Sequence, residues 1–540
     1  MNKIPTLLAA SAVSSASLLP PLPTPLSTPP SSFSAPSTAA DSAKPTFQRL
    51  PASKLRTRLT SVGRLSHATS TVSNPSIASF FLLLSSAPAD PLTAASFSTT
   101  FERVCSSPRY ARFASKLDPR GRFFEPIPSF EPSAAVTQTV HPVLGKGEVQ
   151  RIVGGMLTQS GLPSGAEPGG PPRVGWSAKV SHGLLGSSGV LPPNALLDPG
   201  LTTESLLFFN ASHAIADGVS LGNVLTEVAD ERDEIKGQIA SALEERKKNK
   251  TSKKKLSLLQ RITKFLLSLR WFARGLATLS AQQLRMLFSS GRATNPFLPL
   301  MVPGSTKRSV AWAQAGEVRD ALAVARHFNK ATVNDLFVAC VAGAVRRQVR
   351  EHQKAGRLGG AGEVDNIKVV IPVHLFGGVL LPKQAIGNKI GAVSAEIPTG
   401  GLDSLDATRA ALRITKDTPA PLVAFAAAKV VSYLPGAVAK GLMKIATSNA
   451  CVAISNVRGP EKALHIGGRK VEACCGFVPP PPDVPVGVVV QSYAGKVTVT
   501  VNADAACVPD GDEFLGFVLD EYVRCAREFN VSNGFSGSGE

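Results

Sequence analysis

Cysteine patterns that build a disulfide scaffold or a zinc site are missing from this chain of 540 residues. It has seven cysteines, none of them in a Cys-x-x-Cys pair, and only Cys474 and Cys475 are neighbours. The odd number and the lack of a repeated spacing argue against disulfides and against a metal site. The sequence therefore predicts reduced thiols and no bound metal, in a compartment facing the cytosol or an organelle stroma.

Long apolar runs are also scarce. Residues 77–86 are apolar, but they provide only about half of the ~20 residues that a membrane-spanning helix needs. Residues 420–446 are mostly apolar, yet they carry three lysines and are interrupted by Pro435-Gly436. We expect a buried or surface-lying helix pair there in preference to a span.

Acidic residues are absent between Arg246 and Gly316, where 15 lysines and arginines occur and supply most of the net charge of +19. Before this stretch, residues 224–248 have helical spacing. Within it, residues 256–288 interleave leucine, phenylalanine and tryptophan with arginine and lysine, which is typical of a basic amphipathic helix on a membrane surface. A solvated helix with one face packed on the protein fits equally well. No nucleic-acid-binding motif accompanies the charge, so nucleic acid is not an expected partner.

The start of the chain is also poor in acid, because Asp41 is the one acidic residue among the first 60 and serine, alanine, proline and threonine are abundant. This composition is typical of a disordered leader or an organellar transit peptide. A transit-like leader and a membrane-surface segment point to different membranes, so we expect a membrane-associated protein of either the endoplasmic reticulum or a plastid. The expected organisation is a leader (1–64), an N-terminal domain (65–245), a basic amphipathic linker with possible membrane contact (246–308), a C-terminal domain (309–528) and a disordered tail (529–540).

What the chain does contain is the hexapeptide His213-Ala-Ile-Ala-Asp217-Gly218, directly after an apolar run at residues 206–209. The run predicts a buried strand and the residues that follow predict a helix, so His213 is expected at a strand end. An imidazole can take a proton from a hydroxyl and return it to a leaving group near neutral pH. Taken alone, the hexapeptide also fits an ordinary turn before a helix.

Further motifs follow in the second half of the chain. They are Thr332-Val333-Asn334-Asp335, Gly387-Asn388, Ser455-Asn456-Val457-Arg458-Gly459-Pro460, Ser492-Tyr493-Ala494-Gly495-Lys496 and Val508-Pro509-Asp510. With the hexapeptide, this series resembles the wax ester synthase/diacylglycerol acyltransferase family, in particular its plant-like bifunctional branch. The family usually has two histidines before x-x-x-Asp-Gly, whereas here the first of the two positions is Ser212.

The resemblance implies an α/β (α+β) fold with two chloramphenicol-acetyltransferase-like domains and an active-site tunnel between them. It implies transfer of a fatty acyl group from acyl-CoA, the co-substrate, to a long-chain alcohol or diacylglycerol, with no further cofactor. His213 would be the general base, and Asp217 an orienting residue that we expect to pair with an arginine. Supporting positions are Ser212, Gly218, Asn334, Asp335, Asn388, Ser455 and Asn456.

Roles for the supporting polar residues can be ranked. Asn334 and Asp335 are expected to cap a helix. Asn388 and Asn456 could polarise the thioester, but tying loops together is the favoured role. Two alternatives stay open for the whole chain: another acyl-CoA-dependent acyltransferase of the same fold, and a catalytically weak lipid-binding relative, which Ser212 and the basic segment favour.

Overall fold

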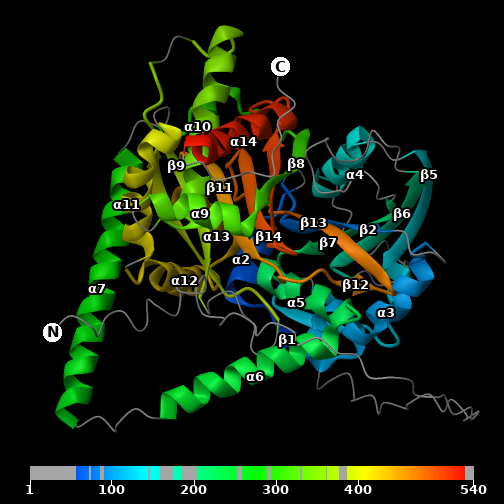
Figure 1. Cartoon of the computed structure of the whole chain (residues 1–540). Coiled ribbons are helices and arrows are strands. Elements are labelled where there is room, and N and C mark those ends of the chain that lie inside the picture. Colours follow the sequence, from blue (N-terminus) through cyan, green and yellow to red (C-terminus); the bar gives the residue numbers. More distant parts are fainter. Residues whose placement is uncertain are drawn as a thin grey trace, which may run out of the picture.

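Two six-stranded mixed sheets lie next to each other and form the frame of the molecule (Figure 1). The computed structural model describes residues 56–528 except 72–73, 86–90, 119, 144–145, 159–173, 185–202, 252–257, 289–293, 329–330, 360–361, 376–385 and 417. The expected leader up to residue 55 and the expected tail at 529–540 therefore lie outside the described residues. Residues 61–64, expected in the leader, form the first turn of helix α2 (Ser61–Thr69).

The first sheet is built around two apolar strands, β2 (Ile77–Ser85) and β7 (Thr203–Ser212), which run antiparallel with Phe80 opposite Phe209. Alternate residues of these strands enter two different cores. Phe209 packs with α3 (Ala94–Ser106) on one face, whereas Phe208 packs with α4 (Lys146–Thr158) on the other. Burial on both faces explains why the two runs are apolar without alternation. The sheet order is β12-β13-β2-β7-β6-β5, with β5 (Val136–Val143), β6 (Trp176–Leu184), β12 (His465–Ile466) and β13 (Arg469–Phe477).

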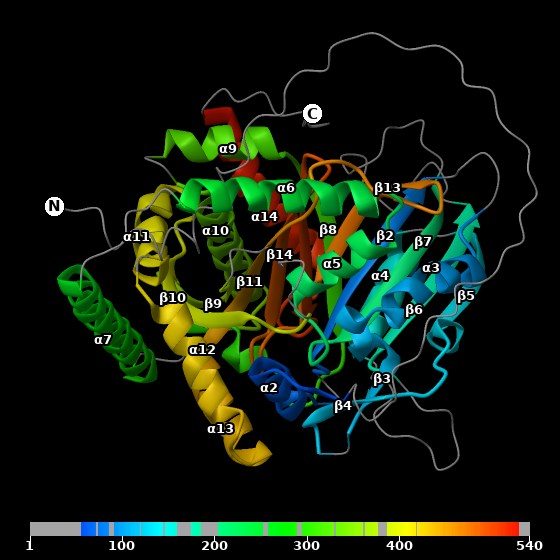
Figure 2. The same cartoon turned by 90° about the horizontal axis from the view of Figure 1, so that it is seen from below.

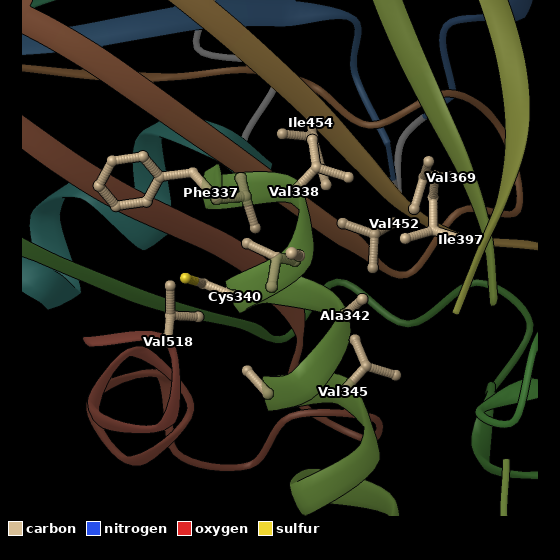
Figure 3. Close-up of a cluster of buried hydrophobic side chains, with 14 of the residues drawn as sticks. Phe337, Val338, Cys340, Ala342, Val345, Val369, Ile397, Val452, Ile454 and Val518 are labelled. Atoms are coloured by element: carbon tan, nitrogen blue, oxygen red, sulfur yellow. The ribbon is translucent and has the colours of Figure 1, made fainter. Parts of the chain in front are cut away.

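The second sheet packs against α10 (Val333–Lys354), a helix buried on nearly all sides between the strands and α14 (Gly511–Glu528). Figure 3 shows Val338 and Ala342 of this helix beside Val452 and Ile454 of the sheet, with Val518 of α14 near Cys340 on the other side. The order is β10-β9-β11-β14-β15-β8, with β8 (Arg308–Glu317), β9 (Asn366–His374), β10 (Ile390–Pro398), β11 (Ala450–Arg458), β14 (Val486–Tyr493) and β15 (Lys496–Asp504).

Several further elements are short or peripheral. They are β1 (Thr57–Arg58), β3 (Ser115–Leu117), β4 (Phe123–Pro126), α9 (Val318–His327), α11 (Leu405–Lys416) and the 3₁₀ turns Pro108–Ala114, Pro132–Ala135, Leu298–Leu300 and Gly401–Ser404.

The two halves exchange chain segments. Strands β12 and β13 belong by sequence to the second half, but β13 pairs antiparallel with β2 in the first sheet. The division at 245 and 309 that the sequence predicts therefore does not separate the two sheets, since residues 465–477 complete the N-terminal one. Trp312 of β8 reaches the other way and meets the Phe81 ring at 5.0 Å between centroids.

The helix predicted over 224–248 is two helices, α5 (Gly218–Val228) and α6 (Arg232–Thr251). The chain leaves the helix at Asp230 because this residue bonds to the β12–β13 turn. Its backbone N–H donates to the His465 carbonyl (2.8 Å), and its carboxylate accepts from Gly467 N (3.1 Å) and Gly468 N (2.7 Å). The expectation of one continuous helix was wrong because such long-range contacts leave no trace in helical spacing.

Three helices stand on the outside of the second half (Figures 1 and 2). The helix α7 (Leu258–Phe288) lies against α12 (Ala420–Val431), which α13 (Gly436–Thr447) follows. The last two are the surface-lying pair expected from the sequence. Within the described residues, none of the helices has the length and apolar character to cross a bilayer. The expected linker ends early, because Asn295 and Phe297 are buried in the second half.

Candidate active site

His213 lies directly after β7, as the sequence predicts, in a turn that is held by main-chain bonds. Its backbone N–H donates to the Ser76 carbonyl (2.8 Å), and the Ile215 N–H donates to the Ser212 carbonyl (2.8 Å). The Ser212 hydroxyl accepts from the Ala214 N–H (3.2 Å). Serine at this position therefore still holds the loop through a hydrogen bond.

The environment of the His213 imidazole favours its neutral form. Burial lowers the pKa of His213, and the nearby Asp217 carboxylate and the residue's own carbonyl only partly oppose this effect. Nδ1 is buried and makes no hydrogen bond to another described residue. In the neutral ring with its proton on Nδ1, Nε2 is the basic nitrogen. A neutral imidazole of this kind can accept a proton at neutral pH.

Asp217 connects the two halves of the chain through main-chain donors. One carboxylate oxygen accepts from Ser220 N (2.8 Å) and so caps α5, and the other accepts from Lys389 N (2.8 Å) in the second half. The residue is 1% exposed. An acceptor-only group with two oxygens is well suited to two backbone N–H groups. Asp217 thus fixes the turn that carries His213 relative to the segment before β10.

The arginine that we expected as a partner of Asp217 is near it but bonds elsewhere. The Arg112 guanidinium donates to the carbonyls of Ile215 (3.1 Å) and Arg58 (3.2 Å). Burial lowers the pKa of Arg112 to about 10, while the negative charge of Asp217 acts in the opposite direction. The expectation of a direct pair was therefore wrong, since the carboxylate oxygens are used by backbone N–H groups. Arg112 supports the same loop because its guanidinium donates to the Ile215 carbonyl.

Asn388 reaches the same loop from the second half. Its Nδ2 donates to the His213 carbonyl (2.5 Å), while Oδ1 is buried without a partner among the described residues. The neighbouring Gly387 exchanges hydrogen bonds with the Ser220 hydroxyl, which donates to its carbonyl (2.9 Å) and accepts from its N–H (3.2 Å). Residues 387–389 and the hexapeptide thus form one hydrogen-bonded unit across the two halves.

His374 is a member of this cluster that the sequence did not single out. It ends β9, and its Nε2 lies 4.0 Å from the Asp217 carboxylate. Burial lowers the pKa of His374, which Asp217 raises and Lys389 lowers. Its sequence setting is the same as that of His213, a histidine at the end of an apolar strand, so this signal was available.

The other predicted positions are distributed differently. Asp335 closes a capping box at the start of α10, where its carboxylate accepts from Thr332 N (2.9 Å) and Thr332 Oγ1 (2.8 Å), and Asn334 is in the same first turn. Ser455 is half-buried and Asn456 exposed, both near the end of β11. This strand end comes close to the hexapeptide, since a Cβ on Gly218 would lie 3.7 Å from the Val457 side chain.

Replacement of Gly387 by alanine should destabilise the joint between the halves. Gly387 has φ +148°, and an added Cβ would lie 2.8 Å from Arg112 Nη1 and 2.9 Å from Thr60 Cγ2. Backbone strain alone costs about 1–3 kcal/mol, so we expect at least this loss in the free energy of unfolding by urea. Gly222→Ala, on the exposed side of α5 with open space around it, is the matched control and should be neutral or stabilising. Equal stability of the two variants would contradict the arrangement.

No group of three or more histidine, cysteine, aspartate or glutamate side chains in the described part of the chain could hold a metal ion. A neutral imidazole at the position of His213 is a group that can take up and release a proton. The tunnel expected between the halves stays a prediction.

Comparison with protein families gives one match, in which residues 386–523 correspond to the WS/DGAT C-terminal domain. This range contains Asn388, Ser455 and Asn456. Two Mycobacterium tuberculosis proteins, whose names provisionally assign them as diacylglycerol O-acyltransferases, are 29% identical over 186 residues. The aligned segment covers 34% of this chain and 35% of each relative, so the chain matches about a third of the length of these curated proteins.

Solved structures extend the comparison to the whole fold. The wax ester synthase/diacylglycerol acyltransferase from Marinobacter aquaeolei VT8 superposes with a TM-score of 0.53 at 15% identity, covering 88% of this chain and 100% of that one. The TRI3 trichothecene 15-O-acetyltransferase from Fusarium sporotrichioides gives a TM-score of 0.53 at 12% identity, covering 87% and 95%. The two-domain acyltransferase fold predicted from the sequence is confirmed.

Proposed function

Because the chain belongs to the wax ester synthase/diacylglycerol acyltransferase family, we propose that it is an acyl-CoA-dependent O-acyltransferase. The proposed acceptors are a long-chain alcohol, which gives a wax ester, and diacylglycerol, which gives triacylglycerol. One observation supports this function above the others. His213 lies in a turn that both halves of the chain hold by hydrogen bonds, and burial lowers the pKa of its imidazole.

In the proposed reaction, Nε2 of His213 accepts the hydroxyl proton of the acceptor while the acceptor oxygen attacks the thioester carbonyl. A carbon–oxygen bond forms, and the carbon–sulfur bond of acyl-CoA breaks. The imidazolium then gives its proton to the departing thiolate, so the histidine returns to its neutral form. Both substrates are bound together, and no acyl-enzyme forms.

The state of the cysteines supports direct transfer. Burial raises the pKa of all seven thiols, to about 11 for Cys474 and about 12 for Cys507 and Cys525. A nucleophilic cysteine needs a lowered pKa so that thiolate is present near neutral pH. These side chains behave as small apolar groups of the core.

Asn388 acts in this proposal as a positioning residue. Its amide N–H holds the His213 carbonyl, which fixes the imidazole at the joint between the halves. Asp217 contributes in the same way through Lys389 and also favours the imidazolium that forms during transfer.

The location that we propose is membrane-associated, at the endoplasmic reticulum or a plastid, on the composition of the leader. Imaging of the full chain with a C-terminal fluorescent tag tests it, and a uniformly cytosolic signal would contradict it.

An assay with palmitoyl-CoA and either hexadecanol or diacylglycerol tests the function. Release of free CoA thiol and formation of the matching ester are measured together, because hydrolysis would release thiol without an ester. Ester formation with either acceptor supports the proposal and assigns the acceptor class. Thiol release without ester, or no product with any acceptor, would favour a lipid-binding relative, the alternative that Ser212 motivates.

The pH dependence of the rate follows from the lowered pKa of His213. The active form is the neutral imidazole, so kcat/KM should rise as the pH increases through this pKa and level off above it. Because the pKa is below the usual 6.5 of histidine, the rate should be constant between about pH 7 and 8 and decrease only in more acidic buffer. Asp217 raises this pKa, so Asp217→Asn should move the acidic limb to still lower pH. A midpoint above pH 7 would contradict the assignment.

A further inference from the structure

The helix α7 exposes apolar side chains of the kind that an ordinary surface helix buries against the protein. Phe265 is 67% exposed and Leu269 is 56% exposed, and further apolar side chains are exposed along the same helix: Leu259, Ile262, Leu266, Leu267, Phe272 and Leu276. Single exposed apolar residues are common on proteins, whereas a continuous set marks an interaction surface.

The α12–α13 pair repeats this pattern a short distance away. Val430 of α12 is 67% exposed, Tyr433 just after this helix is 66% exposed, and Val438, Leu442 and Ile445 are exposed on α13. The helix α7 contacts α12, and α13 follows α12 in nearly the same direction (Figure 2). We call α7, α12 and α13 together the three-helix surface.

A close approach joins the parts of this surface. Gly275 of α7 is buried, and a Cβ on it would lie 2.0 Å from Cγ of Pro419, the residue that precedes α12. Only glycine fits at this crossing. The C-terminal end of α13 is held by Lys368, which is fully buried and donates to the carbonyl of Ser448, the C-cap of this helix (2.6 Å). The surface is thus held on the second half at two defined points.

The charge of the surface has one sign. Acidic residues are absent from 246–316 and again from 418–460 in the sequence. Arg270 and Arg274 are exposed on α7, and Lys429 and Lys444 on α12 and α13. Lys444 forms an ion pair with Asp483 (3.1 Å), which is itself outside the surface. Two copies of this chain joined through the surface would place like charges against each other, whereas an anionic lipid headgroup layer complements them.

We propose that the three-helix surface docks on an anionic lipid bilayer, with the apolar side chains inserted among the headgroups and the basic side chains paired with lipid phosphates or carboxylates. A helix with apolar side chains and interleaved lysine and arginine is the form that lies in the plane of a membrane surface. The α7 part was expected from the sequence, and the structure adds the α12–α13 pair beside it.

This surface lies next to the candidate active site. Both α12 and α13 contact α2, and Arg64 of α2 lies over the Tyr433 ring at 5.2 Å. On its other side α2 touches the catalytic loop, where a Cβ on Gly63 would lie 2.8 Å from the Ala214 carbonyl and 3.3 Å from Asn388 Nδ2. One helix therefore separates the bilayer from the turn that carries His213. A lipid acceptor would approach from this side, a consequence that rests on the proposed function.

Vesicle flotation of the full-length chain tests the docking. The vesicles contain phosphatidylcholine alone or phosphatidylcholine mixed with phosphatidylserine. The paired variants are Phe265→Glu with Leu269→Glu on α7, and Val430→Glu with Val438→Glu on the α12–α13 pair. Each pair should lower the partition coefficient at least about tenfold, because burial of one such side chain contributes about that much. Val140→Glu, on an exposed valine of β5 at the opposite end of the molecule, is the matched control and should bind as the unmodified chain does.

Charge reversal gives the second arm. Arg270→Glu with Arg274→Glu should lower binding to the mixed vesicles at least about 25-fold, because the loss of each positive charge alone lowers it about fivefold and each new carboxylate is repelled. High salt should lower binding of the unmodified chain. Unchanged binding of all three paired variants, or binding that is the same with and without phosphatidylserine, would overturn the proposal. So would a dimer in sedimentation equilibrium that these variants dissociate, because the surface would then belong to a second copy.

Failure of docking and failure of the proposed function can be told apart. His213→Ala should float with the vesicles like the unmodified chain while its rate of ester formation falls about 10²–10⁴-fold. The three-helix variants should keep kcat with a water-soluble short-chain alcohol but show a raised KM for diacylglycerol presented in vesicles. Normal KM for vesicle-borne acceptor in variants that no longer bind would remove the link to acceptor access.

Discussion

Alanine in place of His213 is expected to lower kcat for ester formation about 10²–10⁴-fold, the usual contribution of a positioned general base. The fold should tolerate the change, because the turn is held by main-chain groups that alanine retains. The backbone N–H of residue 213 still donates to Ser76, and its carbonyl still accepts from Asn388. The melting temperature should therefore change little, so the loss of rate reports chemistry.

The measurement is ester formation from palmitoyl-CoA under saturating acceptor, with thermal unfolding of the same preparations. His327→Ala is the matched control, since His327 is exposed on α9 and should leave the rate unchanged. His213→Gln keeps a polar side chain of similar size but lacks a basic nitrogen, so its ester formation should be as slow as that of the alanine variant. Equal rates for the unmodified chain and His213→Ala would eliminate the general-base assignment.

The local part of the site could be predicted because its signals are local. An apolar run, a histidine and an aspartate followed by helical spacing are consecutive in the chain. The structure has β7, the turn with His213 and the Asp217-capped helix α5 in that order. N-caps and buried strands are fixed by neighbours in sequence. The capping box at Thr332 and Asp335 was predictable for the same reason.

Partners that act through the backbone could not be predicted. Lys389 contributes its N–H to Asp217, and any residue except proline offers the same donor. The sequence pattern therefore suggested an arginine side chain as the partner of Asp217, whereas two backbone N–H groups donate to its carboxylate oxygens. The position of β13 beside β2 is similar, because pairing between segments almost 400 residues apart depends on the whole fold.

Removal of the Asp217 carboxylate should have the largest effect on stability at this site. Asp217→Ala removes the cap of α5, which costs about 1 kcal/mol, and leaves the partly buried Lys389 N–H without its acceptor, which costs about 1–3 kcal/mol. We expect a decrease of about 2–4 kcal/mol in the free energy of unfolding by urea. The rate should also fall, because the loop with His213 is no longer fixed to residues 387–389.

Asp510→Ala separates the two contributions. Asp510 is an exposed cap of α14 that accepts from Asp512 N (2.8 Å) and Glu513 N (3.2 Å) within its own half. Its loss should cost about 1 kcal/mol, the value of a cap alone. Asp217→Asn keeps one acceptor oxygen and should be intermediate. If both alanine variants lose the same stability, the Lys389 bond contributes nothing, and the joint between the halves must depend on Arg112, Ser220 and Asn388 instead.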